Sequence, residues 1–217
     1  MLEALRNEVV RCAQEAETQG LCRWRSGNFS ARDKKTGLVC MTPSGVDRRT
    51  MRAEDIVVMN MDARVVETAK GRKPSSETLM HLAAYEVRPD ICAIVHTHSP
   101  FALVFAALER PIPGLVLEAA HLHCEGGSVP VAPFAPQGTA ELADSVRAPL
   151  RMGDALLLAR HGVLTVGTSM DEALLKAAYV EELAEVAYRA AVISDGNMPA
   201  PLTPEAFVLR YPEQIKS

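Results

Sequence analysis

Two histidines stand two residues apart in the segment AIVHTHSP, which covers residues 93–100. The apolar run just before them, residues 91–95, predicts a strand. Side chains at positions i and i+2 of a strand point to the same face, so His96 and His98 would project side by side. Paired imidazoles contribute little to an apolar core, because their ring nitrogens need partners, but they suit a metal ion. Two independent surface or capped histidines are the alternative for this pair alone.

A third histidine, His161, follows the apolar run ALLLA at residues 155–159. A lone histidine there is more often a structural residue with satisfied ring nitrogens, but beside a histidine pair it becomes a candidate third ligand. Three imidazoles with one open coordination position are typical of catalytic zinc sites. Imidazole also binds manganese and cobalt, so the ligands alone do not separate Zn²⁺ from Mn²⁺ or Co²⁺.

Three short polar stretches have the composition of anion-binding turns. They are SGNFS at residues 26–30, TPSG at 42–45 and KPSSET at 73–78. Glycine lets the backbone approach a ligand, and successive N–H groups can cradle an anion. The third stretch precedes a predicted helix, whose N-terminus is suited to phosphate. Ordinary turns, and a serine cap followed by Glu77, are the alternatives. None of the stretches is a P-loop, because no G-K-[ST] follows.

Helices and strands intermix along the rest of the chain. Apolar spacing predicts helices over residues 2–16, 75–87, 101–109, 138–150 and 169–194. Ser75 or Ser76 would cap the second helix and Ser169 the last. Strand patterns cover residues 37–42, 55–61, 63–68, 91–98 and 127–134, and two strands over 154–167 would bend at His161 and Gly162. Without strict βαβ alternation or a linker, we expect one α/β domain over residues 1–217, with a mixed or antiparallel sheet covered by helices.

Composition narrows the class of partner. The chain has 217 residues, of which 48% are hydrophobic and 23% charged, and its net charge is −4. This charge argues against nucleic acid or an anionic membrane as partner. The Arg48-Arg49 pair reads as a solvated turn. Five scattered cysteines without a C-x-x-C motif favour the reducing cytoplasm. The charged N-terminal helix is not a signal peptide, and no apolar stretch approaches the roughly 20 residues that span a bilayer.

Five motifs, taken together, resemble the class II aldolase/adducin family. They are SGNFS, TPSG, PSSE, HTHS and RHG, and they occur in the family's order and spacing. Each motif alone is weak, but the ordered set is specific, and it extends from about Leu2 to the region of Val192. The resemblance implies a single domain whose central, mostly antiparallel sheet lies between helical layers. It also implies a homotetramer with active sites at the subunit interfaces.

The family's functional residues carry over onto matching positions. His96, His98 and His161 match the ligands of a divalent metal, usually zinc. Glu77 matches the catalytic acid/base of P-S-S-E, and Tyr211 would match a family tyrosine. The cradle for the substrate phosphate would consist of Gly27, Asn28, Ser44, Gly45, Ser75 and Ser76.

The implied activity is cleavage of a fuculose- or 5-deoxyribulose-like ketose 1-phosphate into dihydroxyacetone phosphate and an aldehyde. Zinc, as a Lewis acid, would stabilise the charge of the enediolate that cleavage leaves. A carboxylate beside the metal can move a proton at the substrate carbon. The phosphate cradle supplies remote binding energy and orientation. No lysine is needed, because the metal replaces a Schiff base.

One stretch departs from the fuculose-type aldolases. These carry a tyrosine that protonates the departing aldehyde oxygen across the subunit interface, but residues 112–127 of this chain contain none. The polar residues available there are Glu118, His121 and His123.

Two other functions remain open on the same scaffold. A sugar-phosphate 4-epimerase, decarboxylase or dehydratase would use related chemistry, but the family's epimerases tend to carry aspartate where this chain has Glu77. A non-enzymatic, adducin-like interaction domain has no reason to keep three histidines.

Overall fold

The structure, a computed structural model, describes residues 2–69, 71–203 and 206. An eight-stranded sheet with the order β4-β3-β2-β1-β5-β8-β7-β6 forms its centre. Its neighbouring strands pair antiparallel, except β6 and β7, which pair parallel. The strands are β1 (Asn28–Arg32), β2 (Val39–Met41), β3 (Val57–Met59), β4 (Val65–Glu67), β5 (Ala93–Thr97), β6 (Val131–Ala132), β7 (Ala155–Leu158) and β8 (Gly162–Gly167).

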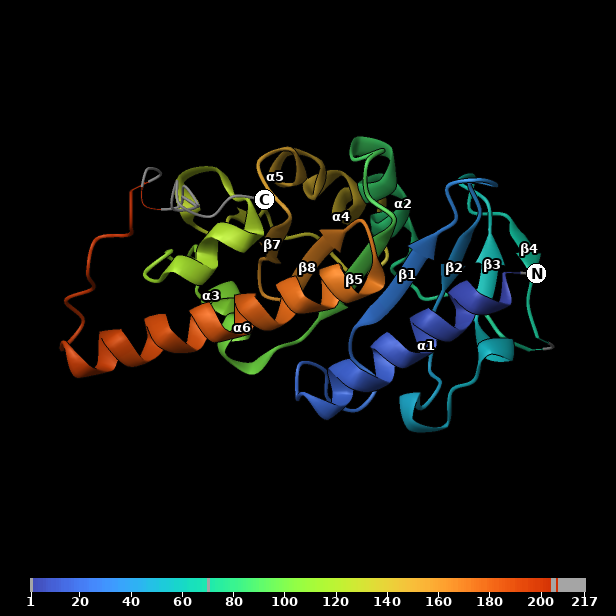
Figure 1. Cartoon of the computed structure of the whole chain (residues 1–217), viewed down its shortest axis with the longest axis horizontal. Helices are drawn as coiled ribbons and strands as arrows, with labels where there is room; N and C mark the ends of the chain where they lie inside the picture. The colour runs from blue at the N-terminus through green and yellow to red at the C-terminus, as the bar shows by residue number, and fades with distance from the viewer. Residues whose placement is uncertain (1, 70, 204–205, 207–217) are drawn as a thin grey trace, which may run out of the picture.

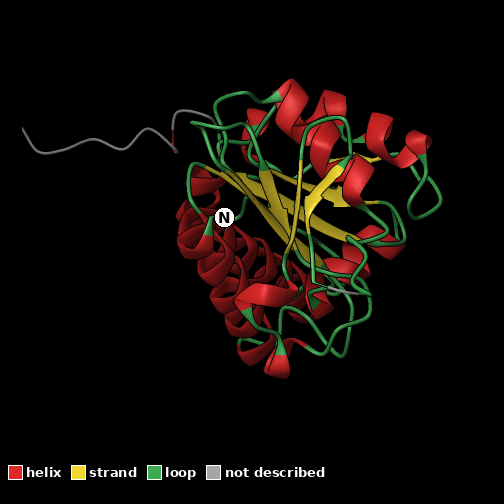
Figure 2. Ribbon diagram, turned by 90° about the vertical axis from the view of Figure 1, so that its right-hand side faces the viewer, coloured by secondary structure: helices red, strands yellow, loops and turns green. Residues whose placement is uncertain are grey.

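Helices cover both faces of the sheet. They are α1 (Glu3–Thr18), α2 (Thr78–Val87), α3 (Pro100–Ala107), α4 (Ala140–Ser145), α5 (Arg147–Arg151) and α6 (Met170–Ile193). Helices α1 and α6 lie along one face, and α2, α4 and α5 lie behind the sheet in the same view (Figure 1). Viewed from the side, the strands run between these two helical layers (Figure 2). The expectation of a mostly antiparallel sheet between helical layers is confirmed.

Side chains of each central strand alternate between two apolar clusters. In β5, Ile94 packs into the cluster that α2, α4 and α5 cover, while Ala93 and Val95 pack toward α1 and α6. Both faces are covered, so the strand reads as a continuous apolar run rather than an alternating one. His96 is two residues after Ile94 and therefore faces the α2 side, within the protein.

Most predicted elements are confirmed, and the last helix begins as expected. The Ser169 hydroxyl accepts a hydrogen bond from the Glu172 backbone N–H at 3.2 Å and caps α6. The predicted helix over 138–150 is two short helices instead. Pro149 has no N–H with which to continue the hydrogen bonds of α4, so that helix ends and α5 begins with the proline in its first turn.

Two predictions about the anion-binding stretches were wrong. Residues 28–30 of SGNFS, taken as part of a turn, belong to strand β1, whose polar sequence is buried between its neighbours. Helix α2 begins at Thr78, with Glu77 rather than a serine at its N-cap. The Ser75 hydroxyl does accept from the Glu77 N–H at 3.2 Å, but this bond closes a turn that precedes the helix. Within the described part of the chain, no helix combines the length and the apolar character that a bilayer crossing requires.

Candidate active site

Strand pairing brings the three predicted histidines together. His96 lies near the end of β5, His98 follows the strand, and His161 lies in the turn between β7 and β8. Because β5 pairs with β8, this turn lies beside the end of β5. The three ring centroids are 4.9–5.2 Å apart, with interplanar angles of 67–81°. One potential ligand atom from each ring lies within 4.8 Å of the others, so the rings surround a common point.

The ring nitrogens are oriented for metal binding. His96 Nδ1 lies 2.8 Å from the Val163 carbonyl oxygen and must donate to it, which leaves Nε2 with a free lone pair. That Nε2 lies 3.1 Å from His98 Nε2. Two nitrogens bound at about 2.0–2.1 Å to one tetrahedral zinc lie roughly 3.3 Å apart, which is close to this spacing. Burial lowers the pKa of His98 to about 3, so its ring is neutral, as a ligand must be.

Glu77 lies against the histidines in a buried position, with 1% of its surface exposed. Its Oε2 is 3.1 Å from His96 Nε2 and its Oε1 is 3.0 Å from His161 Nε2. Burial by itself raises the pKa of Glu77, but the two imidazoles outweigh it and hold the pKa below its ordinary range. Oε1 accepts no hydrogen bond despite its proximity to His161. A buried anionic oxygen without a donor, beside three converging imidazole rings, fits a divalent cation.

Two glycines allow this close packing. A Cβ on Gly162 would lie 2.5 Å from the Thr97 carbonyl oxygen and 2.9 Å from the His96 ring. A Cβ on Gly27 would lie 2.5 Å from the His96 carbonyl oxygen, and its φ of +80° favours glycine as well. The first glycine lets the histidine rings converge, and the second lets the SGNFS stretch lie directly against the histidine strand.

The predicted phosphate residues line a single cavity of about 340 Å³ that also includes Glu77 and His98. The structure therefore brings together three stretches that are far apart in sequence. The six predicted residues in this lining are Gly27, Asn28, Ser44, Gly45, Ser75 and Ser76.

Thr42 joins the three stretches. Its hydroxyl accepts from the Phe29 N–H at 3.0 Å, and its carbonyl accepts from the Ser75 N–H at 3.1 Å. The Ser44 N–H donates to the Lys73 carbonyl at 2.9 Å. These bonds fix the loops relative to one another before any ligand binds, which is the preorganisation that an anion site needs.

Arg48 is not the solvated turn residue that the sequence suggested, because only 3% of it is exposed. Its guanidinium donates to the carbonyls of Trp24, Ser26 and Gly27, the last at 2.8 Å. It also lies 5.6 Å from the centroid of the Phe29 ring. A buried cation thus fixes the loop that contributes Gly27 to the cavity, and the local sequence contained no sign of this burial.

Three further polar residues were missed by the sequence reasoning. Arg25 and Gln137 line the cavity, and Gln137 Nε2 donates to the Ser76 hydroxyl at 3.3 Å. Arg25 stands just before SGNFS, so its place in the chain was the available signal. His81 lies beneath the cavity, where its Nε2 is 2.6 Å from Asn28 Oδ1. Its spacing of four residues from Glu77 could have indicated a shared helix face.

Among the described residues, none of the candidate proton donors of residues 112–127 lines the cavity. Tyr211 lies outside the described residues. The His121 ring stacks on Tyr179 at a centroid distance of 5.0 Å, and His123 Nδ1 lies 2.7 Å from Asp154 Oδ2. Glu118 lies in a short 3₁₀ helix and is likewise not among the cavity's lining residues.

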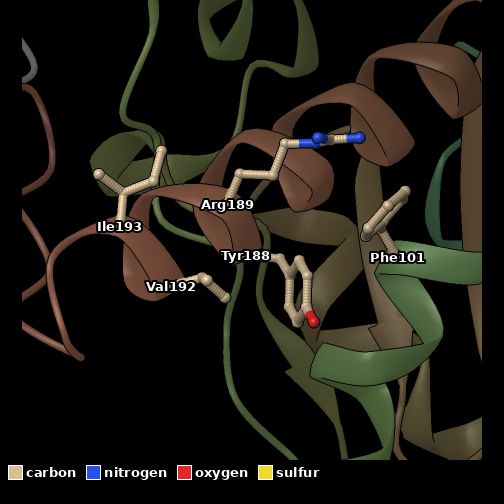
Figure 3. Close-up of a pocket in the computed structure, with 5 residues that line it drawn as sticks. All are labelled: Phe101, Tyr188, Arg189, Val192 and Ile193. Atoms are coloured by element: carbon tan, nitrogen blue, oxygen red, sulfur yellow. The ribbon is translucent and has the colours of Figure 1, made fainter.

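A second hollow of about 340 Å³ lies between the start of α3 and the end of α6. Figure 3 shows its lining, in which Phe101 and Tyr188 face each other with ring centroids 5.6 Å apart. Arg189, Val192 and Ile193 complete it. None of the five described residues that line this hollow carries a carboxylate or an imidazole, so the hollow offers no group for acid–base or metal chemistry, unlike the histidine cavity.

Comparison with known proteins matches residues 7–188 to the family described as Class II Aldolase and Adducin N-terminal domain. The 5-deoxy-D-ribulose 1-phosphate aldolase of Bacillus thuringiensis serovar kurstaki is 35% identical over 91% of this chain and 91% of its own length. The 5-methylthioribulose-1-phosphate/5-deoxyribulose-1-phosphate aldolase of Rhodospirillum rubrum is 38% identical over 88% and 84%. A 4-epimerase of L-ribulose 5-phosphate is also among the relatives. A solved L-fuculose 1-phosphate aldolase superposes with a TM-score of 0.86 and 33% identity, covering 94% of this chain and 92% of its own.

The packing around Gly162 generates a test of the histidine cluster. Gly162→Ala is expected to push the rings of His96 and His98 apart and to weaken divalent-cation binding roughly 10–100-fold. Gly153→Ala is the control, because its Cβ would be as crowded, at 2.7 Å, but against Cys124 rather than a histidine. Competition with a fluorescent chelator measures the affinity of each purified variant for zinc. Equal affinities in both variants would contradict the proposed role of the cluster.

Proposed function

The chain belongs to the class II aldolase and adducin family, as its ordered motifs predict, and we propose that it is a metal-dependent sugar-phosphate aldolase. It would cleave a ketose 1-phosphate into dihydroxyacetone phosphate and an aldehyde. The observation that carries this proposal is a single cavity in which Glu77 and the histidine cluster adjoin three glycine- and serine-rich turns. The fold and the family alone do not identify the reaction. The carboxylate and the imidazoles provide groups for acid–base and metal chemistry, and the turns provide groups that bind a phosphate ester.

Zinc is the ion that we propose for His96, His98 and His161, with manganese or cobalt as replacements that imidazole ligands accept. A divalent ion held there would supply Lewis-acid stabilisation of the negative charge that develops as the carbon–carbon bond breaks. The protein's part is to fix the rings, and the Val163 carbonyl does so for His96.

Glu77 would be the acid/base. In the condensation direction its ionised carboxylate would remove a proton from the hydroxymethyl carbon of dihydroxyacetone phosphate, and in cleavage it would return that proton. The carboxylate lies within 3.1 Å of the nitrogens of His96 and His161. Proton transfer and charge stabilisation would therefore take place at adjacent substrate atoms, which suits bond cleavage next to a carbonyl group.

The substrate phosphate would lie against the three turns at the other end of the cavity. Backbone N–H groups and the hydroxyls of Ser44, Ser75 and Ser76 are the donors that we propose. The Arg25 guanidinium, which makes no hydrogen bond or ion pair with the described residues, adds a positive charge to the lining. Binding the remote phosphate would orient the reacting carbons toward Glu77.

Within ketose 1-phosphates, we favour a substrate whose far end is a methyl or methylthio group. The relatives named for 5-deoxyribulose and 5-methylthioribulose phosphates support this choice. So does the sequence of residues 112–127, which lacks the tyrosine of fuculose-type aldolases. An epimerase acting on a pentulose 5-phosphate is the second candidate, since one is found among the relatives, but Glu77 replaces the aspartate expected there.

A panel of ketose phosphates tests the reaction. The purified, zinc-loaded protein is expected to release dihydroxyacetone phosphate from 5-deoxyribulose 1-phosphate, detected by coupled reduction with NADH. The matched ketose without phosphate should react far more slowly, because it lacks the remote binding energy of the cradle. Equal rates for the two ketoses would contradict a phosphate cradle. Conversion of a pentulose 5-phosphate in the panel into its 4-epimer, with no release of dihydroxyacetone phosphate from the ketose 1-phosphates, would favour the epimerase instead.

Glu77→Gln separates acid/base chemistry from a structural role. If Glu77 transfers the proton, turnover should fall by about 10²–10⁴ while the metal content stays near that of the wild type. Exchange of the hydroxymethyl proton of dihydroxyacetone phosphate with solvent, measured by NMR, should fall in parallel because it needs no aldehyde. Glu86→Gln, on the same helix but paired with Arg147, is the control and should retain both rates. If the proton exchanged at the wild-type rate in Glu77→Gln, a group other than Glu77 would be the base.

We also propose a cytoplasmic homotetramer with active sites at the subunit interfaces, as the family resemblance implies. Supporting it, the described part of the chain exposes large apolar side chains that an interface would cover, namely Leu117, Phe134, Val192 and Ile193. Light scattering of the purified protein should give four times the chain mass, and a monomer with full activity would contradict shared active sites.

A further inference from the structure

A line of five hydrogen-bonded side chains ends at Glu77. Tyr85 Oη lies 2.9 Å from Ser30 Oγ, which lies 2.7 Å from His81 Nδ1. His81 Nε2 lies 2.6 Å from Asn28 Oδ1, and Asn28 Nδ2 donates to Glu77 Oε2 at 2.6 Å. All five residues are buried, and His81 has no exposed surface. Nothing in the proposed reaction has used Tyr85, Ser30 or His81.

The carboxylate of Glu77 determines which atom is the donor in each hydrogen bond of this line. An ionised carboxylate only accepts, so the amide nitrogen of Asn28 must face Glu77, and its oxygen must face His81. His81 Nε2 must then carry the hydrogen, which leaves Nδ1 to accept from the Ser30 hydroxyl. Ser30 in turn accepts from Tyr85. Only one tautomer of His81 satisfies all these contacts.

The charge state of His81 agrees with this single arrangement. Burial lowers the pKa of His81 to about 3, so the ring is neutral across the physiological range. A doubly protonated ring would oppose the Ser30 hydroxyl with a second donor, and the opposite tautomer would place a lone pair against Asn28 Oδ1. Either change would release the Asn28 amide.

The line of hydrogen bonds depends on similar side-chain spacings along a helix and a strand. Glu77, at the N-cap of α2, is followed at spacings of four residues by His81 and Tyr85 on the helix, and Asn28 and Ser30 are spaced by two on β1. Four helical residues rise about 6.0 Å and two strand residues about 6.8 Å, so successive side chains of the two elements meet in turn. The network is therefore a property of how α2 lies over β1.

We propose that His81 is a positioning residue for Glu77. Its Nε2–H holds the Asn28 amide in the one orientation that donates to the Glu77 carboxylate. This inference rests on the proposed role of Glu77 as acid/base. Reversing the amide would place two acceptor oxygens 2.6 Å apart and would turn the carboxylate away from its present contacts with His96 and His161. His81 itself is not among the described residues that line the cavity.

Three variants test the line. His81→Leu removes both ring nitrogens and should lower kcat by up to about 10²-fold, the cost of misplacing a reacting group, with KM within about twofold. His81→Gln keeps an N–H near the position of Nε2 and should recover part of the loss. Tyr85→Phe keeps the aromatic ring but removes the remote hydroxyl, so kcat should stay within about threefold. Loss of activity only in proportion to loss of folded protein, measured by circular dichroism, would overturn the proposal.

A double-mutant cycle distinguishes positioning of Glu77 from general support of the fold. In the Glu77→Gln background, His81→Leu should reduce the residual turnover by less than about twofold, because the group that it positions has lost its function. A similar reduction in both backgrounds would overturn the proposal. If Glu77→Gln alone leaves turnover unchanged, the proposed function of Glu77 fails instead.

The tautomer can be observed without any turnover. In the ¹⁵N-histidine-labelled protein, the Nδ1 of His81 should resonate as a non-protonated imidazole nitrogen and Nε2 as a protonated one, from pH 5 to 8. The assignment comes from the signals that disappear in His81→Gln. A proton on Nδ1 would overturn the proposal whatever Glu77 does in catalysis.

Discussion

The antiparallel pairing of β5 with β8 is the constraint on which the whole site depends. It sets the His161 turn beside the end of β5, although the two segments are more than 60 residues apart in sequence. The pairing of β5 with β1 then brings the glycine-containing loop to the same edge. A register shift of one residue in either pairing would turn His96 to the opposite face of the sheet and disperse the cluster. The cavity therefore follows from backbone hydrogen bonds made well inside the sheet.

A second requirement is electrostatic. Glu77 is ionised in a place where water cannot solvate it, and burial of an isolated carboxylate is strongly unfavourable. The Asn28 amide and the imidazoles of His96 and His161 offset part of this cost, but one carboxylate oxygen keeps no donor. The site thus holds an anion that is only partly satisfied and lies beside the ring nitrogens of His96 and His161, an arrangement that favours binding of a cation. The same buried charge orders the polar groups behind it.

Sequence patterns predicted the parts of the site that depend on local rules. The i, i+2 alternation of strands predicted that His96 and His98 share a face, whereas their identification with His161 as a ligand set also needed the ordered family motifs. Patterns failed where burial comes from distant segments. Arg48 reads as a surface residue because the carbonyls that it binds belong to residues 24–27. Likewise, the sequence of β1 does not read as a strand because Asn28 and Ser30 are polar. Their partners, Glu77 and His81, lie about 50 residues away in sequence.

The spacings along α2 and β1 are similar but not equal. Side chains four residues apart on the helix are about 6.0 Å apart along its axis, and those two residues apart on the strand are about 6.8 Å apart. Each step adds a mismatch of about 0.8 Å, which the row absorbs over the single strand step from Asn28 to Ser30. One step beyond Ser30, Arg32 no longer bonds a side chain of the helix. Its guanidinium lies over the Tyr85 ring at 4.8 Å and donates to the carbonyls of Tyr85 and Pro89. Helix α2 ends at Val87, so it offers no further side chain at this spacing after Tyr85, and the row of buried polar groups ends there.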